Sequence, residues 1–366
     1  MRFIFYSPIN FQRWDWRSSI DEGIGGSETS HVEMAWRLAR RGHEVINYAP
    51  IREDCPSEWK GTKWYDLEKV DFSMDGIWVL YRCPETFDNF TLDHPNKALW
   101  LVHQDWDYPT LQGDRVTKLD KMLILCEWHK RYTLERHPEL EGKIMVTSNA
   151  FKGDLLAQIE AEGIVRNPKK IMYASSPDRG LPQALEIVTR AQEFDPEIEL
   201  HAFYGFNNID KLTHAPQFRY FKKIKEKVLS YEGKPGIYLH GRVNQIDLYR
   251  HWFSSAIWCY PTNFCETSCI TCMEAQAMGA IPVTNAVAAL AENVQWGTFI
   301  TGNAWGDSLT KAKYTAEILR LTSDLELQER IRKLMMEDIR KKFEWEVFVD
   351  QWEKEAEASC CTVKNR

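Results

Sequence analysis

The first 150 residues alternate short apolar runs with amphipathic stretches. The runs have the length of buried strands, and they fall at 2–6, 45–48, 77–81, 98–103, 122–126 and 144–147. Between the first two runs, residues 28–41 place Val32, Ala35 and Leu38 on one helical face. Gly42 then ends the predicted helix. Strands that alternate with helices in this way predict a parallel sheet covered by helices.

A second alternating series follows a predicted hinge at 149–168. Its apolar runs fall at 170–174, 198–204, 236–240, 256–260 and 281–284, and helical patterns lie between them at 182–192 and 246–253. Two consecutive Rossmann-like units suit a two-domain enzyme, and such open sheets bind ligands at the carboxyl ends of their strands. The tail is predicted to be helical, with Trp345, Phe348 and Trp352 burying one face of its last helix. We therefore expect domains at 1–165 and 166–342 and a terminal helix at 343–366.

Composition and charge narrow the class of protein. The 366 residues are 44% hydrophobic and 27% charged, as in a soluble globular protein. A net charge of −7 argues against non-specific binding to a phosphate backbone as the main activity. No apolar run is long enough to span a bilayer, and the amino-terminal run is too short for a signal peptide. The nine cysteines are scattered along the chain, which predicts reduced thiols and a cytoplasmic setting.

The stretch from 264 to 280 carries the strongest chemical signal. It follows the apolar run at 256–260 and a turn at 261–263, and its second half has helical spacing. A strand, a loop and a helix N-terminus form an anion-binding arrangement, because unpaired N–H groups and the positive end of the helix dipole converge there. Glu266 and Glu274 lie on either side of the predicted helix start. The pattern predicts a phosphate site flanked by carboxylates that hold hydroxyl groups.

These residues also resemble a known family. Glu266 and Glu274 form a Glu-x7-Glu pair, with small residues after the first Glu and Gly-Ala-Ile-Pro-Val at 279–283. This string is similar to the donor-site signature of retaining GT-B glycosyltransferases, in particular glycosyltransferase family 4. The resemblance implies an α/β fold of two Rossmann-like domains facing a cleft, with a C-terminal helix that crosses back to the first domain. It also implies retaining transfer of a sugar from a nucleotide diphosphate sugar, without a metal or other cofactor.

The resemblance assigns roles to three candidate catalytic residues. Arg179 precedes Gly180 in the loop after the run at 170–174 and is expected to neutralise the donor diphosphate, although no second basic residue lies nearby. His103 ends the run at 98–103, where the family places a histidine beside the donor sugar. Glu266 is expected to hold the donor sugar.

Other residues are assigned to donor binding. Glu274 is expected to hold the ribose hydroxyls, and the loop with Arg242 and Val243 is expected to lie beside the base. The backbone N–H groups of Thr267, Ser268 and Cys269 are expected to face the phosphate. A glycine-rich turn with Gly25 and Gly26 opens the first helix and resembles the family's donor loop. The same turn could be a dinucleotide fingerprint, but no acidic residue ends the second strand to bind a ribose.

The donor is expected to be a UDP- or GDP-sugar, and the acceptor is not identified by the sequence. A glycan, a lipid, a small molecule and a modified DNA base all fit the same phosphate chemistry. Trp14 and Trp16 lie in the loop before Gly25, where an acceptor would enter, and aromatic faces stack on sugars and bases. These two tryptophans are the predicted acceptor contacts.

Two rival enzyme classes and one non-catalytic class stay open. Asp105 and Asp107 form the Asp-x-Asp pattern that metal-dependent GT-A glycosyltransferases use to hold Mn²⁺ or Mg²⁺. A cysteine triplet (Cys265, Cys269, Cys272) has the Cys-x3-Cys-x2-Cys spacing of an iron–sulfur site, but two of the three would lie in a packed helix as small hydrophobes. A binding module that keeps the fold without activity is the third alternative, and only turnover separates it from an enzyme.

Overall fold

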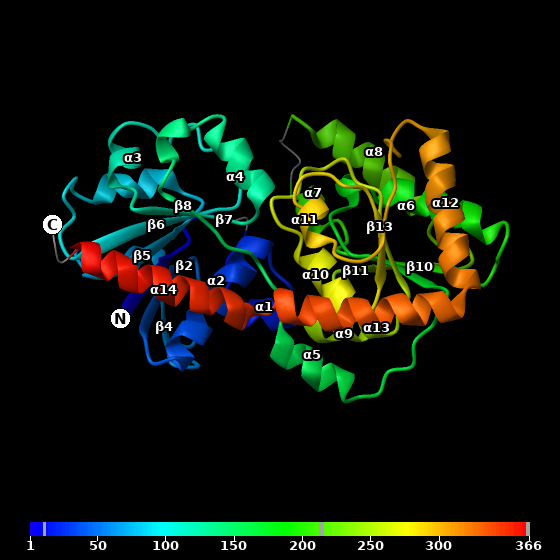
Figure 1. Ribbon diagram of the computed structural model, residues 1–366, viewed down its shortest axis with the longest axis horizontal. Coiled ribbons are helices and arrows are strands. Elements are labelled where there is room, and N and C mark those ends of the chain that lie inside the picture. The colour runs from blue at the N-terminus through cyan, green and yellow to red at the C-terminus, as the bar shows by residue number, and fades with distance from the viewer. Residues whose placement is uncertain (10–11, 212–215, 364–366) are drawn as a thin grey trace. The chain divides into compact units, whose positions relative to one another are not determined.

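The computed structural model describes residues 1–9, 12–211 and 216–363, and Figure 1 shows its ribbon. The chain divides into two compact units. The first comprises Met1–Asn149 together with Glu344–Arg366, and the second comprises Ala150–Phe343. The boundary between the two units, at Asn149–Ala150, falls earlier than the boundary expected after residue 165. The reason is that α5 (Gly153–Glu160) packs on α9 (Gln245–Phe253) of the second unit.

The first unit contains an eight-stranded sheet of order β3-β4-β2-β1-β5-β6-β7-β8. Only the β3–β4 pair is antiparallel. The strands are β1 (Arg2–Tyr6), β2 (Glu44–Ala49), β3 (Glu58–Trp59), β4 (Thr62–Asp66), β5 (Gly76–Tyr81), β6 (Lys97–His103), β7 (Lys121–Ile124) and β8 (Ile144–Val146). The helices are α1 (Ser18–Asp21), α2 (Gly26–Arg40), α3 (Asp114–Lys118), α4 (Glu127–Leu134) and α14 (Trp345–Val363). All six predicted strands and the predicted first helix are confirmed.

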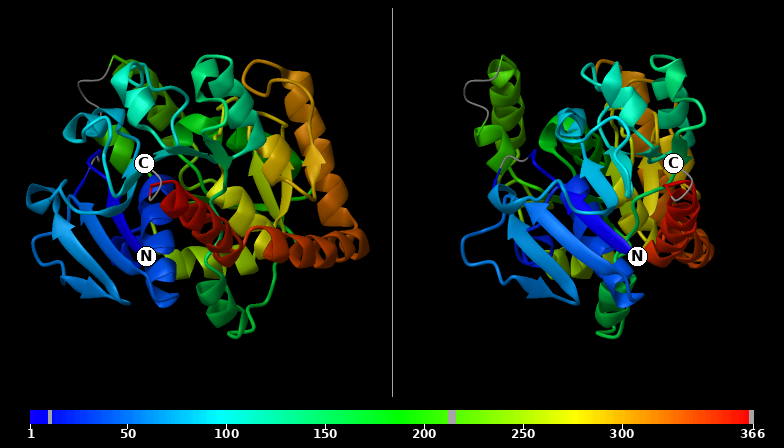
Figure 2. Two further views of the ribbon diagram at one scale, coloured as in Figure 1. Left: turned by 60° about the vertical axis from the view of Figure 1, so that its left-hand side comes forward. Right: turned by 90° about the vertical axis from the view of Figure 1, so that its left-hand side faces the viewer.

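The apolar content of the central strands explains their place in this sheet. Every residue of β6 after Lys97 is buried, as expected for a parallel strand covered on both faces. Helix α2 turns Val32, Ala35 and Leu38 inward, each fully buried. Helix α14 packs against α2 and β6 within the same unit, and its course can be followed in Figure 2.

The second unit contains a six-stranded parallel sheet of order β11-β10-β9-β12-β13-β14. The strands are β9 (Lys170–Tyr173), β10 (Glu199–Phe203), β11 (Ile237–Gly241), β12 (Ile257–Tyr260), β13 (Ile281–Thr284) and β14 (Thr298–Phe299). Besides α5 and α9, the helices are α6 (Leu181–Gln192), α7 (Asn207–Asp210), α8 (Phe218–Leu229), α10 (Ile270–Ala277), α11 (Leu290–Asn293), α12 (Ser308–Ser323) and α13 (Leu325–Lys342).

The strand order of the second sheet locates its ligand-binding edge. The chain runs outward from β9 through β10 to β11 and then returns to place β12 on the other side of β9. The order therefore reverses between β9 and β12. Ligands of open α/β sheets bind outside the carboxyl ends of the strands at such a reversal. The loops after β9 and β12 are therefore the first place to look for a site.

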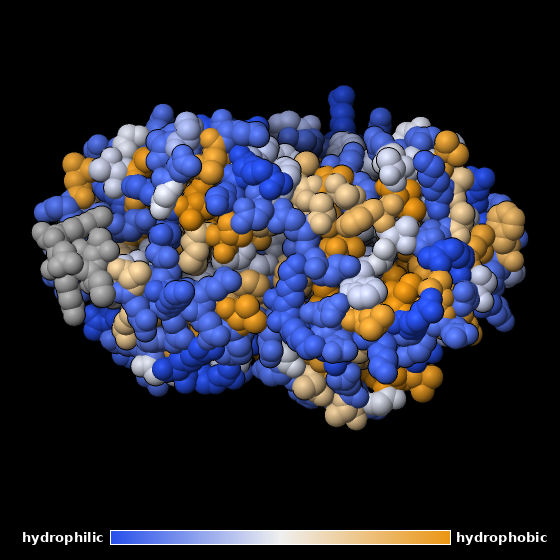
Figure 3. Space-filling view, viewed as in Figure 1, coloured by the Kyte–Doolittle hydropathy of each residue, from blue (hydrophilic) through white to orange (hydrophobic). Residues whose placement is uncertain are grey.

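The surface in Figure 3 is hydrophilic over much of its area, with hydrophobic residues interspersed. Among the described residues, no helix has both the length and the apolar character needed to cross a membrane.

Candidate functional site

Arg179 and Glu266 meet at the reversal of the second sheet. Arg179 lies in a short 3₁₀ turn after β9, and Glu266 lies in the loop between β12 and α10. The Nη1 atom of Arg179 donates to both carboxylate oxygens of Glu266, at 3.0 and 3.1 Å. Both residues are predicted donor-site residues, and the structure places them in direct contact.

A glycine allows the two loops to approach each other. Gly180 has φ +130°, and a Cβ atom there would lie 2.5 Å from the carbonyl oxygen of Pro261. Any side chain at this position would push the β9 loop away from the β12 loop. The guanidinium of Arg179 also lies over the ring of Phe264, 3.9 Å from its centroid. Close backbone packing and a cation–π contact thus hold Arg179 beside Glu266.

The charges of this pair stabilise each other. Burial works against the positive charge of Arg179, but Glu266 outweighs it and raises the arginine pKa above its usual value. Glu266 also accepts a 2.6 Å hydrogen bond from the hydroxyl of Tyr260. Burial, and then the charge of Glu266, raise the pKa of Tyr260 well above its usual value, so Tyr260 remains a hydrogen-bond donor at neutral pH.

Arg179 keeps donors for a ligand. Its side-chain hydrogen bonds to the described residues all involve Nη1, and about a third of the side chain, 32%, is exposed. The guanidinium has five N–H donors in a planar fork, so Nε and Nη2 can face an anion. A fork of this kind grips phosphate in a bidentate manner.

The N-terminus of α10 is partly occupied by the protein itself. The backbone N–H of Cys269 donates to Asn293 Oδ1 at 3.1 Å, so it does not face a phosphate as the sequence predicted. Asn293 carries no motif that could have revealed this role. Ser268 Oγ, in contrast, is buried without a hydrogen-bond partner among the described residues. The predicted phosphate contacts are therefore reduced to Thr267 and Ser268.

Glu274 lies on α10 in a buried polar cluster. Its Oε1 atom accepts a 2.7 Å hydrogen bond from Gln245 on α9, and its side chain is almost fully buried. Burial raises the pKa of Glu274 to about 7, against the opposing effects of Lys152 and of hydrogen bonds from Tyr249 and Gln245. None of these three partners was a candidate in the sequence. A ribose would have to share this carboxylate with Gln245.

The loop after β11 brings Arg242 and Val243 to the same edge of the sheet. The guanidinium of Arg242 lies over the ring of Tyr204, 5.5 Å from its centroid. Tyr204 lies in the loop after β10. Asn244 caps α9, with its Oδ1 atom accepting from the N–H of Asp247 at 2.8 Å. These contacts orient the loop that the resemblance assigns to the base.

The predicted residues of the first unit lie at the carboxyl ends of its own strands. Gly25 is the N-cap of α2 and Gly26 its first residue. A Cβ atom on Gly25 would lie 2.3 Å from Glu28 Oε2, so a carboxylate of the protein lies at this helix N-terminus. An incoming phosphate would require Glu28 to move.

His103 ends β6 in a buried aromatic cluster. Its ring centroid lies 4.4 Å from that of Tyr108 and 4.3 Å from that of His129. Its Nδ1 atom is buried and has no hydrogen-bond partner among the described residues. Burial, and then the neighbouring histidines, lower the pKa of His103 well below its usual value. The ring is therefore neutral at physiological pH.

Solved structures with the same architecture cover nearly the whole chain. Sucrose-phosphate synthase from Thermosynechococcus elongatus matches with a TM-score of 0.70, 14% identity, 96% of this chain and 97% of that chain. A glycosyltransferase from Rickettsia africae matches with a TM-score of 0.71, 14% identity and 98% of each chain. Alr3699/HepE from Anabaena in complex with UDP matches with a TM-score of 0.65, 12% identity, 98% of this chain and 100% of that chain. The chain has the GT-B fold. No protein-family profile matches the sequence, and no curated protein matches it significantly.

The GT-B fold disfavours the GT-A alternative, and the predicted metal ligands have other partners. Asp105 accepts two hydrogen bonds from Arg82, both at 3.1 Å. Asp107 Oδ1 lies 2.8 Å from His137 Nε2 and accepts from the N–H of Tyr108 at 2.8 Å. Neither carboxylate belongs to a potential metal-binding group among the described residues. The two aspartates thus act as local structural anchors.

The iron–sulfur alternative is disfavoured by the geometry of the described residues. Cys269 and Cys272 are buried, and their sulfur atoms do not form a metal-binding group with Cys265 in the described part of the chain. Burial, and then the charge of Glu266, raise the pKa of all three thiols. Buried neutral thiols behave as small hydrophobes, so Cys269 and Cys272 are better explained as apolar residues packed at the start of α10.

Trp14 is a core residue and offers no surface to an acceptor. It is 1% exposed and packs with Trp36 and Trp64 in a small core cluster. Trp16 is partly buried and stacks on Trp59 with ring centroids 4.8 Å apart. Only Trp16 retains accessible surface from this pair, so the prediction of two acceptor tryptophans is wrong for Trp14.

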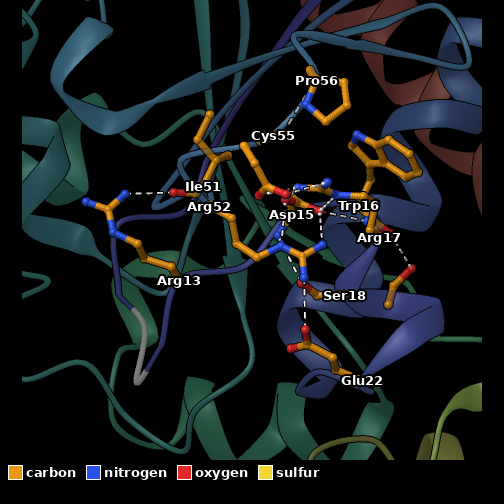
Figure 4. A network of polar contacts seen from close by, with 12 residues as sticks. Arg13, Asp15, Trp16, Arg17, Ser18, Glu22, Ile51, Arg52, Cys55 and Pro56 are labelled. Carbon is orange, nitrogen blue, oxygen red and sulfur yellow. Dashed lines mark hydrogen bonds and ion pairs between the residues drawn. The ribbon is translucent and has the colours of Figure 1, made fainter.

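A buried carboxylate follows Trp14 in the chain. Asp15 is fully buried and accepts from Arg17 Nη2 at 2.7 Å and from Arg52 Nε at 3.0 Å. Figure 4 shows both arginines pointing toward it. Burial alone would raise the pKa of Asp15, but the hydrogen bonds from Arg17 and Arg52 lower it to about 2. The network fixes the loop after β1, and no sequence motif predicts it.

Proposed function

We propose that the protein is a glycosyltransferase that transfers a sugar from a nucleotide diphosphate sugar to an acceptor hydroxyl. The observation that carries this proposal is the contact between Arg179 and Glu266 at the reversal of the second sheet. The start of α10 lies at the same edge. A positive fork, a carboxylate and a helix N-terminus at one sheet edge suit a sugar diphosphate.

The proposed chemistry is electrostatic. Bond breaking leaves negative charge on the departing diphosphate and positive charge on the anomeric carbon, so donors aimed at the phosphate lower the barrier. Arg179 would supply Nε and Nη2, and Thr267 and Ser268 would supply backbone or hydroxyl donors. Glu266 would orient Arg179 through Nη1 and accept hydrogen bonds from hydroxyl groups of the donor sugar. The leaving phosphate would help to take the acceptor proton in a retaining, metal-independent reaction.

Other donor contacts follow from their places in the second unit. Glu274 would hold the ribose after Gln245 yields one carboxylate oxygen. Arg242 and Val243 would line the base. The UDP complex of the Anabaena protein of the same fold supports a uridine nucleotide as the first donor to test.

The first unit would supply the remaining groups. Gly25 and Gly26 would approach the donor by backbone contact, and neutral His103 would hydrogen-bond the sugar. Trp16 is the remaining aromatic candidate for acceptor binding. The acceptor class stays open among glycans, lipids, small molecules and modified DNA bases. We place the protein in the cytoplasm, where its seven described free cysteines would stay reduced.

Nucleotide binding tests the donor site directly. Thermal unfolding would be measured with UDP, GDP, ADP, CDP and TDP, each with and without EDTA. A ligand that binds only the native state raises the unfolding midpoint by mass action. We expect UDP or GDP to raise the midpoint equally in both conditions. A rise that EDTA abolishes would contradict the metal-independent site, and no rise with any nucleotide would contradict the proposed function.

Two matched variants assign the effect to Arg179. Arg179→Met should abolish the nucleotide-dependent rise, while its midpoint without ligand reports any loss of folding. Lys222→Met removes the same charge from an exposed position of α8 in the same unit and should keep the full rise. Release of free sugar or transfer to an acceptor panel then separates an enzyme from a binding module, because only an enzyme consumes the donor.

A further inference from the structure

Three histidines of the second unit converge away from the Arg179–Glu266 pair. His201 lies on β10, His240 on β11 and His251 on α9. One ring nitrogen of each lies within 4.8 Å of the others. The closest pair is His201 Nδ1 and His240 Nε2, which are 2.9 Å apart. All three residues are partly exposed, so an ion could enter from solvent.

The surroundings of His201 resemble the outer shell of a metal site. Its other ring nitrogen, Nε2, lies 3.3 Å from Glu199 Oε2, and the same oxygen accepts from Asn167 Nδ2 at 3.2 Å. A histidine that ligates a metal usually donates its second N–H to a carboxylate or carbonyl, which fixes the ring and its tautomer. Glu199 is placed to do this for His201, leaving Nδ1 directed at the other histidines.

We propose that His201, His240 and His251 bind one divalent transition-metal ion, with Zn²⁺ as the best match. Neutral imidazole suits zinc, copper and nickel and is a poor ligand for magnesium or calcium. Zn–N bonds are roughly 2.0–2.1 Å long, so His201 and His240 would have to separate slightly from their 2.9 Å contact as all three nitrogens move to one ion. Water would occupy the fourth position on the exposed side.

Lys170 limits the affinity of this site. Its Nζ atom lies 2.9 Å from His251 Nδ1 and donates to Ser254 Oγ at 2.6 Å. An ammonium beside a bound cation is unfavourable, so Lys170 must turn away when the ion binds. Glu199 beside His201 and Asp247 near His251 are anions that act in the opposite direction. Lys170 therefore offers a variant whose effect has the opposite sign to loss of a ligand.

A bound ion would join three elements of the second unit. It would link the edge strand β11 to β10 and to α9. Without an ion, β11 is joined to β10 by strand hydrogen bonds, and α9 contacts both strands through the ring of His251. His240 directly precedes Gly241 and Arg242. The site would thus stiffen the loop that carries Arg242 without touching the donor.

Zinc titration of the metal-free full-length protein tests the proposal, with Zn²⁺ alone as the probe and calorimetry as the readout. We expect one Zn²⁺ per chain and a higher unfolding midpoint with Zn²⁺ than with EDTA. His240→Gln should weaken binding by at least about tenfold. His43→Gln, the same substitution on the first unit, should bind as the wild type does. Lys170→Met should bind more tightly than the wild type.

The variants keep each outcome decisive. Circular dichroism and the midpoint in EDTA report whether each variant folds. If His240→Gln fails to fold, tighter binding by Lys170→Met supports the site and unchanged or weaker binding overturns it. Absence of Zn²⁺ binding by the wild type, or equal affinities of His240→Gln and His43→Gln, would overturn the proposal and mark any remaining binding as adventitious.

Discussion

The buried carboxylates of the second unit are in contrasting environments. Glu266 receives hydrogen bonds from a charged guanidinium and a phenol. Glu274 lies eight residues later and is buried among Gln245, Tyr249 and Lys152, where burial raises its pKa to about 7. The same motif thus supplies one carboxylate that is paired with an arginine and one whose pKa lies near physiological pH.

This contrast predicts a pH-dependent cost in stability. The pKa of Glu274 rises from 4.5 to about 7 on folding, so between these values the folded chain keeps a proton that the unfolded chain has lost. Stability from this group is therefore present below about pH 4.5 and is lost as the pH rises through 7. Glu274→Gln stays neutral. We expect it to exceed the wild type by less than about 1 kcal/mol at pH 5 and by up to roughly 3 kcal/mol at pH 8.

Urea unfolding of both proteins at pH 5 and pH 8 measures this difference. Glu337→Gln, at an exposed position of α13, serves as the control and should leave the pH dependence unchanged. A stability difference between Glu274→Gln and the wild type that is the same at both pH values would contradict the prediction.

At the scale of elements, the apolar pattern predicted the strands and the loops at their carboxyl ends. The runs at 170–174 and 256–260 became adjacent strands, so the loops with Arg179 and Glu266 met. Periodicity says nothing about which way a loop side chain turns. The pattern therefore does not reveal that Trp14 packs into a core cluster with Trp36 and Trp64. It also does not reveal the contact of Asn293 with the start of α10, because this contact joins distant segments.

Gly180 is the position where the meeting of these loops can be tested. Gly180→Ala would place a Cβ atom 2.5 Å from Pro261 O in a strained backbone region. We expect loss of more than about 1 kcal/mol of stability and weaker nucleotide binding, because Arg179 would move relative to Glu266. Gly233→Ala has φ +77° and no atom within 4 Å of the added Cβ, so it carries the strain without the clash.

Comparison of the two glycine variants separates these effects. Denaturant unfolding gives the stability cost, and the nucleotide-dependent rise in unfolding midpoint gives the effect on the donor site. Gly233→Ala should lose stability and keep the full nucleotide response. An unchanged nucleotide response in Gly180→Ala would show that close loop packing is not needed to position Arg179.

At the scale of the whole molecule, the chain passes between its two units at Asn149–Ala150 and again at Phe343–Glu344. The last helix therefore completes a core whose other parts were contributed at the start of the chain. Its Trp352 ring stacks with Phe5 at a centroid distance of 6.3 Å and packs edge-on to Trp100 at 5.9 Å. Trp352 Nε1 donates to Thr147 Oγ1 at 3.1 Å.

These contacts predict that a destabilising substitution in α14 lowers the stability of the first unit. Trp352→Ala removes a side chain that is 2% exposed and should cost roughly 3–5 kcal/mol through the cavity it leaves. Hydrogen exchange followed by mass spectrometry would locate the effect. We expect faster exchange in β1 and β6 and unchanged exchange in β9 and β12. Trp296→Ala, which removes a donor to Asp338 in the second unit, should give the reverse pattern. Faster exchange throughout the chain in both variants would mean that the two units unfold as one cooperative body.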